Sequence, residues 1–159
     1  MLIMEELSNK IIEQLPFGDK FTFVDEITEA SLDEFEGVYT FREDEIFYPY
    51  HFKEMPVTPG VIIIETMGQI GVVCFFIYIM MKEKGLTDFS KIKPAPTSCE
   101  VDFLKPIFPG DKVTVRSKKI YFRLNKLKCH VEMTNQRGEA VCKGYLSGIS
   151  LDQDSGIYL

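Results

Sequence analysis

Apolar residues follow one another through most of the stretch 61–81, the longest hydrophobic run of the chain. Thr58 before Pro59 and Gly60 predicts a helix start, because a threonine side chain can cap free amides and a proline at the first helical position gives up no hydrogen bond. A helix that is apolar on nearly all sides is usually buried inside a protein or lies in a membrane. We therefore expect a central helix over 61–81.

The length of this helix alone would permit a membrane span. Against a span, Glu65 lies in the second turn and Gln69 one turn further on the same face, and a carboxylate in hydrocarbon is costly. Gly68 and Gly71 would let a sheet or a second helix approach closely. The helix also lacks a basic flank at its start and has strand-like sequence on both sides. These features favour a helix buried in a protein core, with no membrane span.

The rest of the chain predicts one short helix and about six strands. Residues 2–14 carry apolar positions at helical spacing and predict an amphipathic helix. Gly85 is expected to end the central helix, and a connecting loop is expected over 91–96. Stretches rich in β-forming residues, separated by turn residues, predict strands at about 20–30, 34–41, 98–103, 112–122, 126–135 and 140–150. One long helix with these strands predicts an α+β fold, in which an antiparallel sheet wraps the helix.

Composition narrows the class of protein. The 159 residues suit a single domain over 1–159, with the short helix followed by a core over 15–150. A net charge of −6 argues against a nucleic-acid surface. The N-terminus lacks the basic region and cleavage site of an export signal. The four cysteines form no Cys-x-x-Cys pair, so we expect reduced thiols, no metal site and a cytoplasmic location.

His51 and Glu65 are the candidate acid–base pair, because one precedes the central helix and the other lies in its second turn. An imidazole can take up a proton near neutral pH, and a carboxyl group in apolar surroundings can stay protonated and donate one. Free amides around Gly60 carry the positive end of the helix dipole and could hold an oxyanion. Each residue alone has a structural explanation. Together they predict a site, with Gln69 in a supporting role, as a hydrogen-bond partner either of Glu65 or of the backbone beside it.

The stretch HFKEMPVTPGVIIIETMGQ resembles the signature of the β-hydroxyacyl-(acyl carrier protein) dehydratases of the FabZ type. Their pattern is His-Phe-Pro-Gly-x-Pro-x-x-Pro-Gly, then an apolar run and Glu-x-x-x-Gln, and the interval from His51 to Glu65 is retained. LPFGDKFTFVDEI and VDFLKPIFPGDKV resemble two further motifs of the family, so the resemblance covers about 15–150. Lys53 and Glu54 replace the Pro-Gly that follows His-Phe in the family.

The resemblance implies a hot-dog fold, in which a curved antiparallel sheet surrounds the central helix and two subunits form a homodimer or an oligomer of dimers. It implies that His51 takes the C2 proton of a (3R)-hydroxyacyl thioester carried on acyl carrier protein, while Glu65 of the facing subunit protonates the departing 3-hydroxyl. The Gly60 amide would polarise the thioester carbonyl, and no cofactor would be needed. Isomerising relatives use an aspartate as the acid, so Glu65 implies plain dehydration.

Two other functions fit parts of the same sequence. A hot-dog thioesterase would need a polar group that activates water at the thioester, whereas His51 with Glu65 and Gly60 suits removal of the C2 proton better. A non-catalytic acyl-binding or assembly partner is favoured by the altered loop at Lys53 and Glu54, and disfavoured by the retention of both ionisable residues. The dehydratase interpretation is compatible with fatty-acid synthesis or with a specialised pathway making polyene or lipid-like products.

Overall fold

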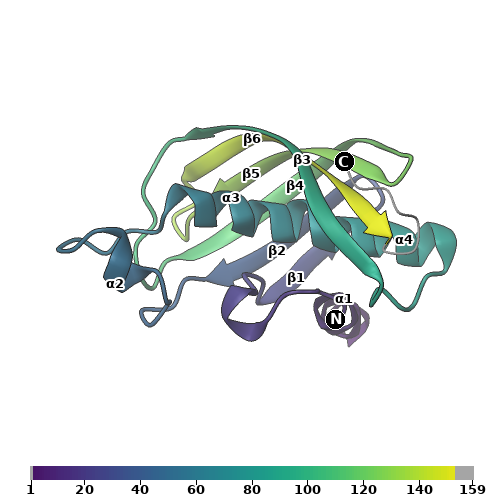
Figure 1. The fold of residues 1–159 in the computed structure, drawn as a ribbon, viewed down its shortest axis with the longest axis horizontal. Coiled ribbons are helices and arrows are strands. Elements are labelled where there is room, and N and C mark those ends of the chain that lie inside the picture. The colour runs from purple at the N-terminus through teal and green to yellow at the C-terminus, as the bar shows by residue number, and fades with distance from the viewer. Residues whose placement is uncertain (1, 153–159) are drawn as a thin grey trace.

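A computed structural model describes residues 2–152 of the chain, which form one curved sheet around one long helix (Figure 1). In chain order the elements are α1 (Leu2–Glu13), the 3-10 helix η1 (Asp19–Phe21), β1 (Glu26–Ala30), β2 (Glu34–Thr40), α2 (Tyr48–His51), α3 (Gly60–Gly68), the π-helical segment η2 (Gln69–Cys74), α4 (Phe75–Lys84), β3 (Ile92–Phe103), β4 (Lys112–Arg123), β5 (Lys126–Thr134) and β6 (Ala140–Asp152). The six strands pair antiparallel in the order β1-β2-β4-β5-β6-β3. The predicted α+β arrangement is confirmed.

The central helix, formed by α3, η2 and α4, is the core of the fold. It ends at Gly85, whose φ of +62° is a left-handed conformation that glycine adopts without strain. The described part of the chain has one helix long and apolar enough to cross a membrane, Gly60–Lys84, and 61% of its most apolar window is buried by the rest of the fold. Every second residue of β5 faces it, as the alternation of that strand predicts. The structure thus places this helix in the core formed with the sheet.

The middle of the central helix is widened where it crosses the sheet. In a π-helical segment the regular hydrogen-bond ladder is shifted by one residue, which can free a backbone carbonyl. Here the Gly71 carbonyl oxygen accepts a buried hydrogen bond of 2.7 Å from the Ser117 hydroxyl on β4. A Cβ added at Gly71 would lie 2.9 Å from Val131 Cγ1 on β5. Helix and sheet therefore approach at Gly71 more closely than a side chain permits.

Gly71→Ala is expected to lower the free energy of unfolding by about 1 to 3 kcal/mol, the usual cost of overpacking a core. Gly68→Ala is the matched control, since its added Cβ would meet no other atom within 4 Å. Alanine in a helix interior is favoured over glycine by about 0.5–1 kcal/mol, so this variant is expected to be slightly stabilised. Chemical denaturation of both variants measures the difference. Equal stabilities would contradict the close packing at Gly71.

The first strand is shorter than the predicted 20–30, because β1 begins at Glu26. The cause is the side-chain amide of Gln69, which donates to the Phe21 carbonyl oxygen at 2.9 Å and accepts from the Phe23 amide at 2.8 Å. The Phe21 and Phe23 backbone groups are therefore held by the central helix, and pairing with β2 starts only with the Asp25 amide, which donates to the Val38 carbonyl oxygen at 2.9 Å. The prediction from β-forming residues alone was wrong over 20–25.

The predicted loop over 91–96 is also wrong, because β3 begins at Ile92. Pro94 pairs with Ser150 and Pro96 with Gly148 on β6. β3 is the last strand in the sheet order and so forms an edge. Proline is tolerated on an edge strand, since its missing donor can face away from the neighbouring strand. The remaining boundaries of strands and helices lie close to those predicted.

Candidate active site

His51 is the last residue of α2, which lies beyond the N-terminal end of the central helix (Figure 1). Its imidazole is partly buried, and Nδ1 lies 2.9 Å from the Val57 carbonyl oxygen. A carbonyl oxygen can only accept a hydrogen bond, so Nδ1 carries the proton and donates it. In the neutral ring Nε2 is then the unprotonated nitrogen. This arrangement leaves His51 with a nitrogen suited to act as a base.

Glu65 is partly buried in the second turn of α3, and its position is set by Gln69 one turn further along. Glu65 Oε1 accepts a hydrogen bond of 2.9 Å from Gln69 Nε2. Both polar atoms of the Gln69 side-chain amide are also hydrogen-bonded to the backbone of the segment before β1. Because Gln69 is held at both ends, it fixes one oxygen of the Glu65 carboxyl group and leaves the other available.

A cavity of about 270 Å³ runs along the central helix from Ile64 to Ile77. At 1.5 Å per helical residue this stretch measures about 20 Å. The other walls come mainly from β3, from β6 and from Gln14, Pro16 and Phe17, and are largely apolar. Glu65 and Gln69 line the end nearest the helix start. A long apolar cavity with a carboxyl group at one end suits a hydrocarbon chain whose reacting group lies beside that carboxyl.

The N-terminal end of α3 presents a free amide at Gly60. The predicted cap is wrong, because the Thr58 hydroxyl is paired with the Tyr48 hydroxyl at 2.7 Å and the helix has no side-chain cap. The Pro59 carbonyl oxygen accepts the amides of the following turn, and nothing in the described residues accepts a hydrogen bond from the Gly60 amide. A free amide at a helix N-terminus attracts negative charge, so Gly60 can serve an oxyanion.

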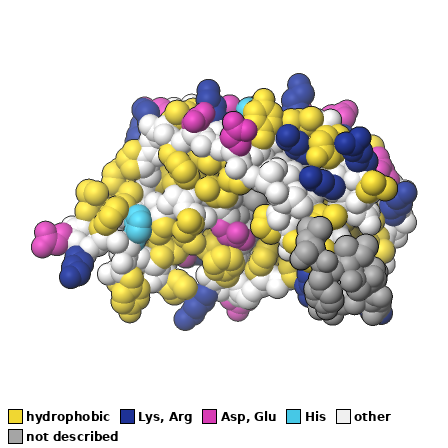
Figure 2. Space-filling model, turned by 45° about the horizontal axis from the view of Figure 1, so that its top comes forward, with side chains coloured by type: hydrophobic (Ala, Val, Ile, Leu, Met, Phe, Trp, Pro, Cys, Tyr) yellow, Lys and Arg dark blue, Asp and Glu magenta, His cyan; other side chains and the backbone are white. Residues whose placement is uncertain are grey.

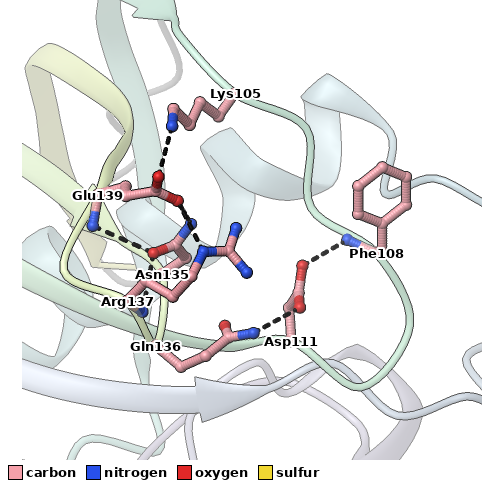
Figure 3. Close-up of polar contacts among 7 residues, drawn as sticks. All are labelled: Lys105, Phe108, Asp111, Asn135, Gln136, Arg137 and Glu139. Atoms are coloured by element: carbon pink, nitrogen blue, oxygen red, sulfur yellow. Dashed lines mark hydrogen bonds and ion pairs between the residues drawn. The ribbon is translucent and has the colours of Figure 1, made fainter.

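The connection between β3 and β4 is hydrogen-bonded to the segment that precedes α3. The Ile107 carbonyl oxygen accepts the Thr58 amide at 2.8 Å, and Ile107 is fully buried. The Asp111 carboxylate holds this connection by accepting from the Phe108 amide and from the Gln136 side chain, at 2.9 and 2.8 Å (Figure 3). Gln136 belongs to the turn between β5 and β6. The helix start is thus tied, through the β3–β4 connection, to the turn between β5 and β6.

The same turn is stiffened around the carboxylate of Glu139. This carboxylate accepts hydrogen bonds from Lys105, Asn135 and Arg137 (Figure 3). The contacts, with that of Lys105 the largest, lower the pKa of Glu139 from its usual 4.5 to about 2. Glu139 therefore stays ionised at physiological pH and keeps the β3–β4 connection joined to the β5–β6 turn.

Within one chain, His51 and Glu65 do not meet. In the part of the chain that the structure describes, no hydrogen bond or ion pair joins them, and the cavity lined by Glu65 does not include His51. The structure brings Glu65 and Gln69 together and places His51 on the segment leading to Gly60. Within one chain, the two ionisable groups therefore share no direct contact.

An apolar patch surrounds α2 and the start of α3, and hydrophobic side chains gather at that end of the molecule in Figure 2, on the left. Its exposed members are Tyr50, Phe52, Met55, Val61, Phe103, Leu104 and Phe108. Exposed apolar patches of this kind mark protein–protein interfaces. The free edge of β3 ends at the same patch, and an unpaired strand edge is a template for pairing with another chain. His51 therefore lies beside a surface suited to a partner subunit.

The comparison with known protein families matches residues 15–146 to the FabA-like domain. The chain belongs to the FabA-like family. Among its relatives, the 3-hydroxyacyl-[acyl-carrier-protein] dehydratase FabZ of Caldicellulosiruptor bescii is 34% identical over 143 residues, which cover 87% of this chain and 94% of that protein. The FabZ of Caldicellulosiruptor saccharolyticus is 34% identical over 143 residues, 86% of this chain and 92% of that protein.

Solved structures agree on the fold. The dehydratase heterocomplex ApeI:P from Xenorhabdus doucetiae superposes with a TM-score of 0.74 and 14% identity, over 91% of this chain and 92% of that one. A hypothetical thioesterase with coenzyme A from Streptococcus pneumoniae gives a TM-score of 0.58 and 16% identity, over 80% and 86%. This FabA-like chain thus has the hot-dog fold that the resemblance implied.

Sequence reasoning missed two contacts of the FabA-like site. The Val57 carbonyl that orients His51 is a backbone group, so no residue type marks it in the sequence. The pairing of Tyr48 with Thr58 was hidden because a threonine before Pro-Gly fits an N-cap equally well. The available signal was Tyr48, three residues before the candidate histidine, because the hydroxyl of a buried tyrosine usually finds a hydrogen-bond partner.

Proposed function

We propose that this FabA-like protein is a dehydratase that removes water from (3R)-hydroxyacyl thioesters carried on acyl carrier protein, leaving trans-2-enoyl thioesters. The observation that carries the proposal is the Glu65 carboxyl group at one end of a long apolar cavity. The relatives of the chain also support the proposal, since two that are matched over nearly their full length are named 3-hydroxyacyl-[acyl-carrier-protein] dehydratase. The cavity would take the acyl chain and bring carbon 3 to the carboxyl group.

We propose that His51 is the base and Glu65 the acid. His51 Nε2 takes the proton from C2, and the electron pair of that C–H bond forms the C2–C3 double bond. The C3–O bond breaks as the protonated Glu65 gives its proton to the leaving hydroxyl, which departs as water. Charge that develops on the thioester oxygen is stabilised by the Gly60 amide at the helix N-terminus. His51 ends protonated and Glu65 ionised, and return of the proton resets the site.

We propose further that the two groups come from facing subunits of a homodimer, alone or within a larger assembly. The separation of His51 from Glu65 in one chain, the apolar patch around α2 and the free edge of β3 all support this arrangement. An isologous dimer would contain two identical sites, each with His51 from one chain and Glu65 from the other.

We propose a reducing, cytoplasmic setting for the reaction. The cysteines of the described chain are all free thiols, and three of them, Cys74, Cys129 and Cys142, are buried. Burial raises the pKa of Cys129 to about 11, so its thiol stays protonated and unreactive at neutral pH. Thiols of this kind need no oxidising compartment.

The function is tested by incubating the protein with 3-hydroxyacyl carrier proteins of graded chain length and following the carrier-bound product by mass spectrometry. Loss of one water from the acyl chain is the expected result. Release of a free acid would identify a thioesterase instead. If neither an enoyl product nor a free acid forms at any chain length, the protein is not the proposed dehydratase, and an acyl-binding or assembly role takes its place.

A further inference from the structure

A hydrogen bond between two side-chain hydroxyls closes the base of the loop that carries His51. Tyr48 Oη and Thr58 Oγ1 lie 2.7 Å apart, and each residue is only 4% exposed. Tyr48 begins α2, three residues before His51, whereas Thr58 lies two residues before Gly60. The bond therefore joins the helix that carries the proposed base to the start of the helix that offers the free amide.

Few other contacts set the position of this loop. Residues 52–56 are all exposed, and within the described chain they make no hydrogen bond or ion pair. Inside the loop, the remaining cross-link is the bond from His51 Nδ1 to the Val57 carbonyl oxygen. Val57 directly precedes Thr58, so the carbonyl that orients the imidazole moves with the residue that Tyr48 holds.

Both partners of the hydroxyl pair are anchored on their other sides. The Thr58 amide donates to the Ile107 carbonyl oxygen at 2.8 Å, and the Tyr48 amide to the Glu45 carbonyl oxygen at 3.2 Å. The Tyr48 ring also packs edge-on against Phe47, with ring centroids 4.8 Å apart. The hydroxyl pair thus connects two anchored parts of the fold across a loop that has only one other cross-link, the bond from His51 to Val57.

We infer that Tyr48 and Thr58 form a clasp that positions the His51 imidazole relative to the Gly60 amide. A buried hydroxyl is costly unless it is bonded, and two apolar side chains of similar shape would fill this space without that cost. What the hydroxyl pair adds is direction, because a hydrogen bond fixes both distance and angle. Tyr48 and Thr58 are positioning residues, since neither is proposed to touch the substrate.

The inference of a clasp rests on the proposed function of His51 as the base. Steady-state kinetics of variants that lack one hydroxyl test it. Tyr48→Phe and Thr58→Val each remove one hydroxyl and keep the shape of the side chain. Because a misplacement of about 1 Å can cost about a hundredfold in rate, each variant is expected to lower kcat by about 10- to 100-fold, with KM little changed. Thr58→Ser keeps the hydroxyl and is expected to retain most of kcat.

The double variant separates positioning from stability. A single substitution leaves one buried hydroxyl without a partner, whereas Tyr48→Phe with Thr58→Val leaves none. The double variant is therefore expected to recover thermal stability but to keep the low kcat of the single variants, so that the two losses do not multiply. Recovery of kcat together with stability would overturn the clasp and leave only a packing role.

A spectroscopic measurement tests the clasp without any turnover. Imidazole ¹⁵N chemical shifts report which ring nitrogen carries the proton, and His130→Ala removes the signals of the second histidine. In the parent protein the neutral His51 ring is expected as the Nδ1–H form, bonded to Val57. In Tyr48→Phe and Thr58→Val a larger share of the Nε2–H form is expected. An unchanged tautomer together with unchanged kcat would overturn the inference. Failure of the parent protein to dehydrate would instead overturn the proposed function.

Discussion

Replacing His51 by alanine or Glu65 by glutamine is expected to lower kcat for dehydration by about a hundredfold to ten-thousandfold, the usual cost of losing a general base or acid. Both side chains are partly exposed, so neither change opens a cavity in the core. Glutamine at position 65 keeps the volume and can still accept the hydrogen bond from Gln69 Nε2. What it cannot do is donate an acidic proton to the leaving hydroxyl.

Matched controls come from the same chain. His130 lies on β5 and packs edge-on against Tyr145, so His130→Ala changes a histidine outside the proposed site. Glu83 is exposed near the end of α4, so Glu83→Gln changes a carboxyl group on the same central helix as Glu65. Both controls are expected to keep wild-type kcat. Steady-state kinetics and thermal unfolding measure all four variants, and near-wild-type turnover by Glu65→Gln would remove this residue from the mechanism.

The central helix and most strand boundaries were predictable because they follow from periodicity. Alternation along β5 and the long, mostly apolar stretch 61–81 each have one favourable arrangement, a half-buried strand and a core helix. The length and hydropathy of this stretch would permit a membrane span. The cost of placing the Glu65 carboxylate in hydrocarbon was the stronger argument, and it favoured a core helix.

Prediction failed where a distant side chain or the sheet order decides the backbone. The segment before β1 is held by Gln69, more than forty residues away in sequence, and no local pattern encodes that contact. The prolines at 94 and 96 indicate a loop unless the strand is known to lie at an edge. Thr58 fits an N-cap by type, and only the folded position of Tyr48 reveals its other partner.

The site was predictable in its residues more than in its geometry. Spacing and a resemblance to known dehydratases singled out His51, Glu65, Gly60 and Gln69, and the structure shows Gln69 bonded to Glu65. How His51 and Glu65 are arranged does not follow from their spacing in the sequence, because they lie on separate elements, α2 and α3, and the proposed site takes them from different subunits. Symmetry between chains leaves no mark on a single sequence.

Two inactive variants are expected to restore each other's activity if the site is shared between subunits. In a dimer of one His51→Ala chain and one Glu65→Gln chain, the intact Glu65 of the first faces the intact His51 of the second. The other site carries both changes. Mixing equal amounts with random re-pairing makes about half of the dimers mixed, so activity should recover to about a quarter of wild type under two-fold symmetry.

The most direct measurement of the shared acid–base site uses mixed dimers isolated on two different affinity tags, one on each variant chain. Each isolated dimer should contain one working site of two, so the dehydration rate per dimer should reach about half of the wild-type value, while each variant alone stays at least about a hundredfold lower. If His51 and Glu65 instead acted within one chain, both sites of the mixed dimer would lack one group. Mixed dimers as inactive as their parents would contradict the account.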